Sequence, residues 1–211
     1  MTRYTRGGLA DVTRAWTAAT RHWANSLLEA HRATLAGLGV LEDIEVGDTK
    51  GTAYREPEWS FERSAEDRED LGEGDTVRFT KRLDEEDVVS FATASGDTNR
   101  LHLDDEFAEG TRFGGRIVHG TLVGGLISAA LARLPGLTIY LSQDLQFRNP
   151  VEIGHTLTAE VEIIEDLGDG RYRLRTDVFD DDAGQTVIEG EAVVLVDSLP
   201  EGVSHPSLEQ A

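Results

Sequence analysis

The stretch GTLVGGLISAALARL, residues 120–134, is apolar on nearly every face when it is coiled as a helix. Large and small apolar side chains cover several faces of that helix, at Leu122, Val123, Leu126, Ile127, Ala130 and Leu131. A helix that is apolar all round must be surrounded by other structure. The sequence therefore predicts a central helix that is buried within its domain.

Four strand-like runs follow this helix. They cover residues 138–147, 156–164, 171–179 and 186–196, and turn signals rich in Gly and Asp separate them. Short turns between successive strands indicate an antiparallel sheet. A further strand, at residues 76–83, precedes the helix. We therefore predict an α+β fold in which an antiparallel sheet curls around the central helix.

The first seventy or so residues have a different character. From residue 10 to about 38, apolar residues that include Trp16 and Trp23 recur at three- and four-residue steps, which predicts an extra N-terminal helix. This helix either packs on the main domain or in a dimer seam, or docks on an apolar surface or a partner. Residues 42–70 are polar and contain Gly and Pro, which is typical of a partly ordered linker.

These patterns divide the chain into three regions. We expect a helical extension with its linker at residues 1–70, the main domain at 71–197, and a flexible tail at 198–211. A chain of 211 residues has room for one sizeable core with a small appendage.

The chain is strongly acidic. Its net charge is −20, and its only lysines are Lys50 and Lys81. Such a field repels nucleic acid and anionic membranes. Disorder and a dedicated acidic tail explain the acidity poorly, because 39% of the residues are hydrophobic and the acidic residues are spread along the chain. We favour a globular surface adapted to high salt, in which counterions screen the self-repulsion, over an ordinary acidic protein or a specific cationic partner.

The absence of cysteine excludes a disulfide framework, a thiolate metal site and a cysteine nucleophile. No stretch approaches the length of a membrane span, and the first residues lack the apolar core of a signal peptide. We expect a cytoplasmic protein.

Two short segments carry candidate chemistry. SGDTNRLHLD, residues 95–104, places Asp97 and His102 on an irregular segment after a predicted helix that Asp84 caps, with Asp87 in the capping-box position. A carboxylate and an imidazole can share general base and general acid work.

The second segment, IVHG at residues 117–120, opens the central helix. There the free amide of Gly120 could face developing negative charge. Each candidate also has a plainer interpretation. Asp97 could serve simply to cap a turn, and Gly120 could serve simply to permit close packing.

These segments, in this order, resemble those of the MaoC-like hydratases and especially the (R)-specific enoyl-CoA hydratases. LQFRNPVEIG, residues 145–154, resembles the strand that follows the central helix in that family, and the likeness runs from about residue 71 to 196. The resemblance implies a hot-dog fold, in which the sheet wraps the helix, and a homodimer. It also implies reversible hydration of trans-2-enoyl-CoA to (R)-3-hydroxyacyl-CoA, without a metal or redox cofactor.

The resemblance also implies roles for particular residues. Asp97 and His102 would hold the catalytic water, and the N–H of Gly120 would bind the thioester oxygen. Ser128, on the central helix, matches a serine that supports the aspartate, although a bond to its own helix backbone explains it nearly as well. Two further supporting residues are expected, Asn99 as a brace of the loop and His119 as a residue that orients the turn.

Some positions depart from the family pattern or stay open. Arg100 stands where proline is usual, so the loop lacks a fixed φ angle, and His155 stands where aspartate is common. Coenzyme A carries phosphates, and the candidates for binding them are Arg112, Arg116, Arg133 and Arg148. Pairing with surface carboxylates explains these arginines equally well.

Three functions remain in competition at the level of sequence. The first is the hydratase, in fatty-acid or polyhydroxyalkanoate metabolism. The second is a noncatalytic acyl-CoA-binding or storage-granule protein that docks through its N-terminal helix, and the third is an acyl-CoA thioesterase on the same fold.

Overall fold

One antiparallel sheet of six strands organises residues 59–200, which are the residues that this computed structural model describes. The strands are β1 (Ser60–Arg63), β2 (Thr76–Arg82), β3 (Leu137–Phe147), β4 (Thr156–Gly168), β5 (Arg171–Asp180) and β6 (Gln185–Asp197). Their order in the sheet is β1-β2-β4-β5-β6-β3. The five strands predicted from sequence are confirmed to within a few residues.

β1 was not predicted. It lies inside the stretch that was interpreted as a linker, and it pairs antiparallel with β2, with Ser60 opposite Thr80. Its four residues are too few to show a clear alternation of apolar and polar side chains. A short 3₁₀ turn, Arg68–Asp70, leads from β1 towards β2. The predicted N-terminal helix and the residues from 201 onward lie outside the described residues.

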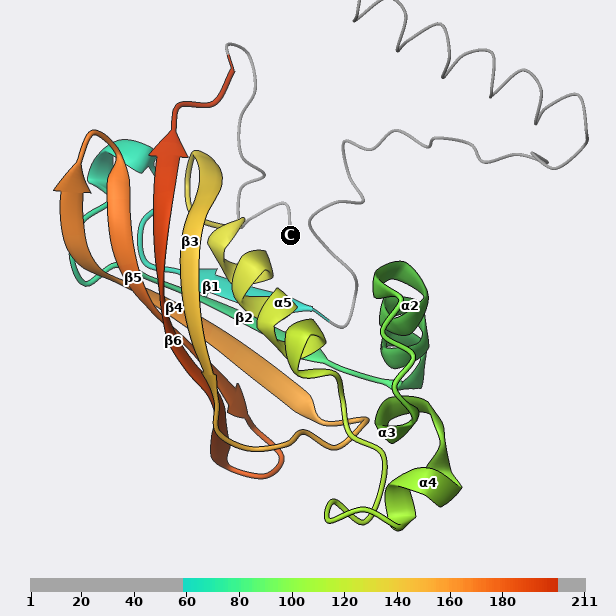
Figure 1. Cartoon of the computed structure of the whole chain (residues 1–211). Helices are drawn as coiled ribbons and strands as arrows, with labels where there is room; N and C mark the ends of the chain where they lie inside the picture. Colours follow the sequence, from blue (N-terminus) through green and yellow to red (C-terminus); the bar gives the residue numbers. More distant parts are fainter. Residues whose placement is uncertain (1–58, 201–211) are drawn as a thin grey trace, which may run out of the picture. The chain divides into compact units, whose positions relative to one another are not determined.

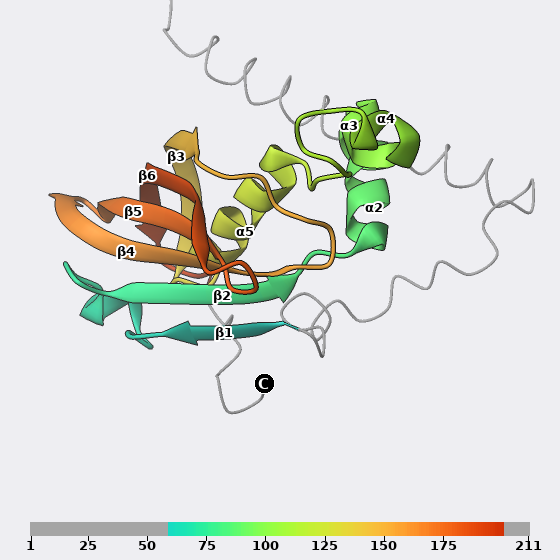
Figure 2. The same cartoon turned by 90° about the horizontal axis from the view of Figure 1, so that it is seen from below.

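The central helix α5 (Gly120–Leu131) lies against one face of the curved sheet (Figures 1 and 2). It contacts β2, β3, β4 and β5. Its inner side buries Ile127 completely, together with Val123, Leu126, Ala130 and Leu131. Alternate residues of β4 and β5 meet these side chains, because successive side chains of a strand point to opposite faces. The structure therefore confirms the predicted sheet curled around a helix, although the helix ends three residues before Leu134.

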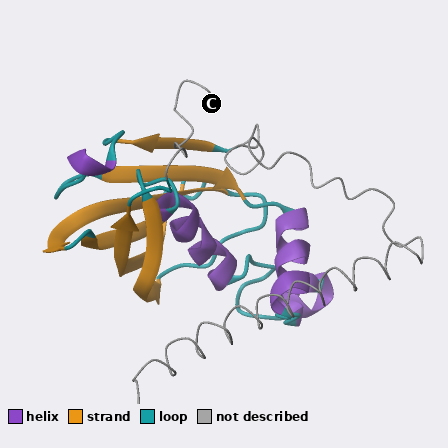
Figure 3. Ribbon diagram, turned by 90° about the horizontal axis from the view of Figure 1, so that it is seen from above, coloured by secondary structure: helices purple, strands orange, loops and turns teal. Residues whose placement is uncertain are grey.

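Three shorter helices gather at one end of α5 (Figure 3). They are α2 (Glu85–Ser95), α3 (Arg100–Leu103) and α4 (Asp105–Glu109). The predicted capping box is confirmed, since Asp84 accepts the N–H of Asp87 and Asp87 accepts that of Asp84. Gly96, with φ of 78°, ends α2 in the left-handed conformation that glycine adopts readily. The chain leaves α2 at Gly96, and Asp97 then follows beside the start of α5.

No helix among the described residues has both the length and the apolar character that a membrane crossing requires.

His155 joins the start of β4 to the turn between β5 and β6. Its Nδ1 lies 2.8 Å from a carboxylate oxygen of Asp180, whose side chain is 1% exposed. Asp180 also accepts the backbone N–H groups of Asp182 and Ala183. The hydrogen bond with Asp180 raises the pKa of His155 above its ordinary value of 6.5, against the opposing effect of burial, and the charges of Asp180 and Glu152 add to the increase.

The contact between His155 and Asp180 should make the stability of the fold depend on pH. A raised folded-state pKa means that the stabilisation is complete below the unfolded pKa of about 6.5 and is lost as pH rises through the folded value. We expect His155→Asn to lower the free energy of unfolding by roughly 1 kcal/mol at pH 6, with a smaller difference at pH 9. Urea denaturation of both proteins at the two pH values measures this difference in the free energy of unfolding. A difference that is the same at both would contradict this assignment.

Candidate active site

Short-range hydrogen bonds shape the loop that carries Asp97. Its N–H donates to Ser95 Oγ over 3.1 Å, and its Oδ1 accepts the N–H of Asn99 over 3.3 Å. Asn99 is the N-cap of α3, and its Oδ1 accepts the N–H of Leu101 over 3.1 Å. Asn99 therefore braces the loop through its side chain.

Arg100 lies outside this network. Its side chain is 64% exposed and pairs with Asp104 one helical turn later, with 2.8 Å between Nη2 and Oδ2. The guanidinium also lies 4.6 Å from the centre of the Phe107 ring. The Arg100 side chain thus lies against solvent and α4, whereas the geometry of Asp97 depends on Ser95 and Asn99.

His102, on α3, is 8% exposed, and its Nδ1 lies 2.7 Å from the backbone oxygen of Ile117. A carbonyl oxygen can only accept a hydrogen bond, so Nδ1 carries the proton. In the neutral ring Nε2 therefore has a free lone pair. Because Ile117 lies just ahead of α5, this bond also ties α3 to the start of the central helix.

His119 connects the two predicted segments. It is 1% exposed, and its Nε2 lies 3.0 Å from the backbone oxygen of Asp97. Its ring stacks on that of His102, with centres 3.9 Å apart and planes 30° from parallel. Phe91 of α2 packs beside it, with 4.9 Å between ring centres. His119 thus does more than orient a turn, and sequence spacing gave no signal for the stack.

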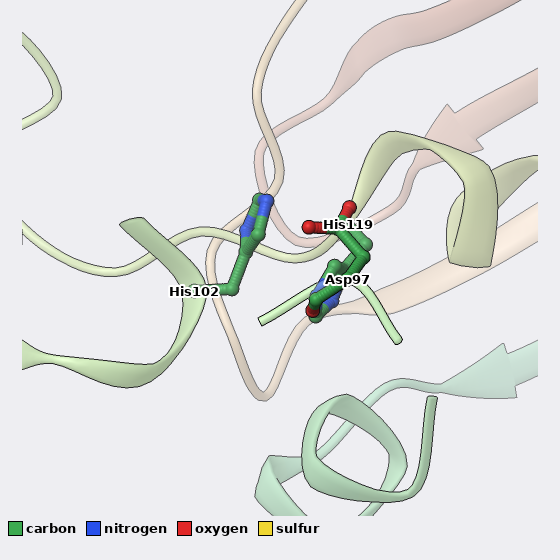
Figure 4. A group of neighbouring side chains, drawn as sticks. All are labelled: Asp97, His102 and His119. Atoms are coloured by element: carbon green, nitrogen blue, oxygen red, sulfur yellow. The ribbon is translucent and has the colours of Figure 1, made fainter. Parts of the chain in front are cut away.

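The side chains of Asp97, His102 and His119 converge between α3 and the start of α5 (Figure 4). One oxygen of Asp97 and one nitrogen of each ring lie within 4.8 Å of one another. Each imidazole uses one nitrogen on a backbone oxygen, which leaves its second nitrogen for another partner. The donor atoms of this group are of the types that bind transition metals, and they can equally hold a water and move its protons.

Gly120 is the first residue of α5, directly after His119. The first N–H groups of a helix lack partners within the helix and lie at its partly positive end. The ring of Phe147, from β3, closes over this glycine, so that a Cβ there would lie 3.0 Å from the ring. The close approach therefore favours a residue without a side chain.

A cavity of about 270 Å³ adjoins these residues and includes His102 and Gly120 in its wall. We call its buried apolar wall the cavity floor, formed by Val118, Val123, Val151, Val187 and Ile188. We call its exposed wall the cavity mouth, formed by Arg112, Phe147, Arg148, Asn149 and Pro150. Residues of α5, β3 and β6 meet here. Nothing in the sequence indicates this convergence, because it results from the pairing of the strands.

Ser128 is on the central helix α5, as predicted, and its support of Asp97 stays a prediction. It lies on an exposed side of α5, about two turns beyond Gly120. Within residues 59–200 no hydrogen bond joins its side chain to Asp97.

The four candidate arginines have different surroundings. Arg116 lies between Glu85 and Asp105, at 2.6 and 2.7 Å. Arg133 is 5% exposed and packs its guanidinium 4.2 Å from the centre of the Phe79 ring. These two therefore serve the structure. Arg112 and Arg148 are the two that line the cavity.

Comparison with known proteins places this geometry in a family. The MaoC-like domain matches residues 69–187. An (R)-specific enoyl-CoA hydratase of Rhodospirillum rubrum is 43% identical over 131 residues, which cover 61% of this chain and 90% of that protein. A 3-hydroxybutyryl-CoA dehydratase of Methylorubrum extorquens is 44% identical over 130 residues, which cover 61% of this chain and 82% of that protein.

A solved structure shares the fold of this chain. A solved R-hydratase of Pseudomonas aeruginosa, in its unliganded form, superposes with a TM-score of 0.60 and 38% sequence identity, covering 71% of this chain and 98% of that one. The matched part of the chain contains both candidate segments, the central helix and most of the sheet. This chain belongs to the MaoC-like domain family and has the hot-dog fold.

Proposed function

We propose that this chain is a hydro-lyase that reversibly hydrates trans-2-enoyl-CoA to (R)-3-hydroxyacyl-CoA. The observation that carries the proposal is the convergence of Asp97 and His102 beside a cavity whose wall includes the first residue of α5. Relatives named for this reaction, at 43% and 44% identity, support it. Fatty-acid and polyhydroxyalkanoate metabolism both use such thioesters, and we propose a cytoplasmic enzyme of one of them.

The chemistry requires a base near C3, a proton source near C2 and a partner for the enolate-like oxygen. A water held by Asp97 and His102 adds its oxygen to C3 while the pair accepts its proton, and C2 receives a proton from the same pair. His102 suits the base role because its Nδ1 is engaged by Ile117, which leaves Nε2 to accept. The N–H of Gly120 binds the thioester oxygen as its negative charge grows, an effect worth roughly 3 kcal/mol.

Supporting roles follow from the contacts. Asn99 holds the loop, and His119 holds the backbone of Asp97 beside the ring of His102. The support of Asp97 by Ser128 stays a prediction from the resemblance, as does adaptation of the acidic surface to high salt.

Incubation of the full chain with crotonyl-CoA tests the proposal. We expect loss of the enoyl absorbance and a product that chiral analysis identifies as (R)-3-hydroxybutyryl-CoA, in low and in concentrated salt. Release of free CoA would instead indicate a thioesterase, and absence of turnover would leave a binding protein.

We also propose a homodimer formed through β3. This strand is at one end of the sheet and pairs only with β6 in the described part of the chain. Its apolar side chains are unusually exposed, with values of 40% for Ile139, 51% for Leu141 and 55% for Phe147. An uncovered apolar edge strand of eleven residues invites pairing with another strand, and a second copy offers the same surface in a symmetric contact.

Sedimentation velocity tests the dimer. We expect the full chain to sediment as a dimer and the double variant Ile139→Lys/Leu141→Lys as a monomer, because two like charges would face each other across the interface. Ile164→Lys/Leu167→Lys, which alters two exposed apolar residues of β4, is the matched control and should stay dimeric. A dimer that persists in the β3 variant would place the interface elsewhere.

A further inference from the structure

The two ends of the cavity suit two chemically different parts of one ligand. The cavity floor is apolar and buried, whereas the cavity mouth presents two arginines and an asparagine. An apolar group would be stabilised at the floor, and an anionic group at the mouth. A thioester with an acyl chain at one end and a phosphorylated carrier at the other has this distribution of polarity.

The two arginines of the mouth differ in their charge balance. Arg148 is paired with Glu189, with 2.6 Å between Nη2 and the carboxylate oxygen, and its Nε donates to the same oxygen over 2.7 Å. Its positive charge is therefore already compensated. Arg112 forms no ion pair with any carboxylate of residues 59–200. The net charge of the chain is −20, so an arginine without a carboxylate partner at the mouth of a cavity is unexpected.

The backbone on both sides of Arg112 is held in place. Thr111 donates its N–H and its hydroxyl to the backbone oxygen of Ala108, the latter over 2.7 Å. Its Oγ in turn accepts the N–H of Phe113 over 3.2 Å, and its backbone oxygen accepts the N–H of Gly114. Arg112 therefore stands on a fixed turn, with its guanidinium 4.9 Å from the centre of the Phe113 ring. Such a side chain loses less freedom when it binds an anion than one on a loose loop.

We infer that Arg112 binds a phosphate group of the thioester's carrier and so sets the affinity for substrate. This inference rests on the proposed hydratase function. Arginine suits the task, because its planar fork can donate two hydrogen bonds to one phosphate. The reacting end of the substrate lies with Asp97, His102 and Gly120, so Arg112 contributes to binding alone. Coenzyme A and a phosphopantetheine group share this phosphate chemistry.

Three crotonyl thioesters test the inference with the full chain: crotonyl-CoA, crotonyl-phosphopantetheine and crotonyl-N-acetylcysteamine. They share the reacting group, and the last has no phosphate. We expect Arg112→Ala to raise KM for crotonyl-CoA about tenfold or more with kcat unchanged, since binding is lost equally in the ground and transition states. Its kcat/KM for crotonyl-N-acetylcysteamine should equal that of the parent protein, and Arg112→Lys should restore part of the affinity for crotonyl-CoA.

The control is Arg171→Ala, which removes the same charge from an exposed site beside Asp169, away from the cavity. It should leave all three thioesters unaffected. A loss confined to crotonyl-CoA would assign Arg112 to a nucleotide phosphate, and a loss shared with crotonyl-phosphopantetheine would assign it to the pantetheine phosphate.

Two results would overturn the inference: an unchanged KM for crotonyl-CoA in Arg112→Ala, or an equal loss with the thioester that lacks phosphate. If the parent protein turned over none of the three thioesters, the proposed function itself would be wrong.

Discussion

His102→Asn is expected to lower kcat for crotonyl-CoA hydration by about 10²- to 10⁴-fold. The asparagine amide can still donate to the backbone oxygen of Ile117, which Nδ1 reaches over 2.7 Å, but the ring nitrogen that we propose as acceptor of the water proton is gone. Asp97→Asn should cause a loss of similar size. The oxygen of the new amide still accepts the N–H of Asn99, but the negative charge of the carboxylate is gone. Initial rates measured by enoyl absorbance give both values.

The double variant sharpens this result. Residues that act as one unit give losses that do not add, so Asp97→Asn/His102→Asn should be little slower than either single variant. Asp169→Asn is the matched control, since it makes the same chemical change at an exposed residue of the β4–β5 turn, where a φ of 55° also suits asparagine. Full activity in either single variant, with the fold intact by circular dichroism, would remove the pair from the mechanism.

Gly190→Ala is expected to lower the free energy of unfolding by about 2 kcal/mol or more. Gly190 lies on β6 opposite Leu145 of β3, and a Cβ there would lie 2.3 Å from the backbone oxygen of Asp144. Backbone cannot move aside as a flexible side chain can, so the pairing of β3 with β6 must shift around Gly190. Thermal and urea unfolding measure the loss, and the dimer proposed through β3 should weaken with it.

Gly125→Ala makes the same chemical change without the collision. A Cβ at this position of α5 meets nothing within 4 Å, and alanine favours a helix by about 1 kcal/mol over glycine. This variant should be as stable as the parent protein or more so. Equal stability of Gly190→Ala and the parent would show that β3 tolerates the shift.

The elements that sequence predicted well are those that local chemistry determines. The capping box of Asp84 and Asp87 lies within four residues, and β2, β4, β5 and β6 show their alternation directly in the sequence. The candidate Gly120 was also recognisable, because an apolar helix that follows a short turn shows where its free amides begin.

The site contacts that sequence could not predict join residues distant along the chain. His119 meets the backbone of Asp97 across 22 residues, and His102 meets Ile117 across 15. His155 was recognisable only as a departure from the family pattern, and its partner Asp180 lies 25 residues further on. These contacts depend on how α3, α5 and the strands pack, and that packing leaves no periodic signal in the sequence. The domain start expected at Leu71 likewise gave no hint of β1, which is too short to show a pattern.

The solvent-facing position of Arg100 has a consequence for how this site tolerates change. A proline at residue 100 would restrict the loop through its own fixed φ angle. Here hydrogen bonds from Ser95, Asn99 and His119 hold the loop instead. An exposed ion pair such as Arg100–Asp104 contributes little to stability, so little of the loop geometry depends on that side chain. The position is therefore open to drift during evolution, and divergence there is no sign that the neighbouring chemistry has been lost.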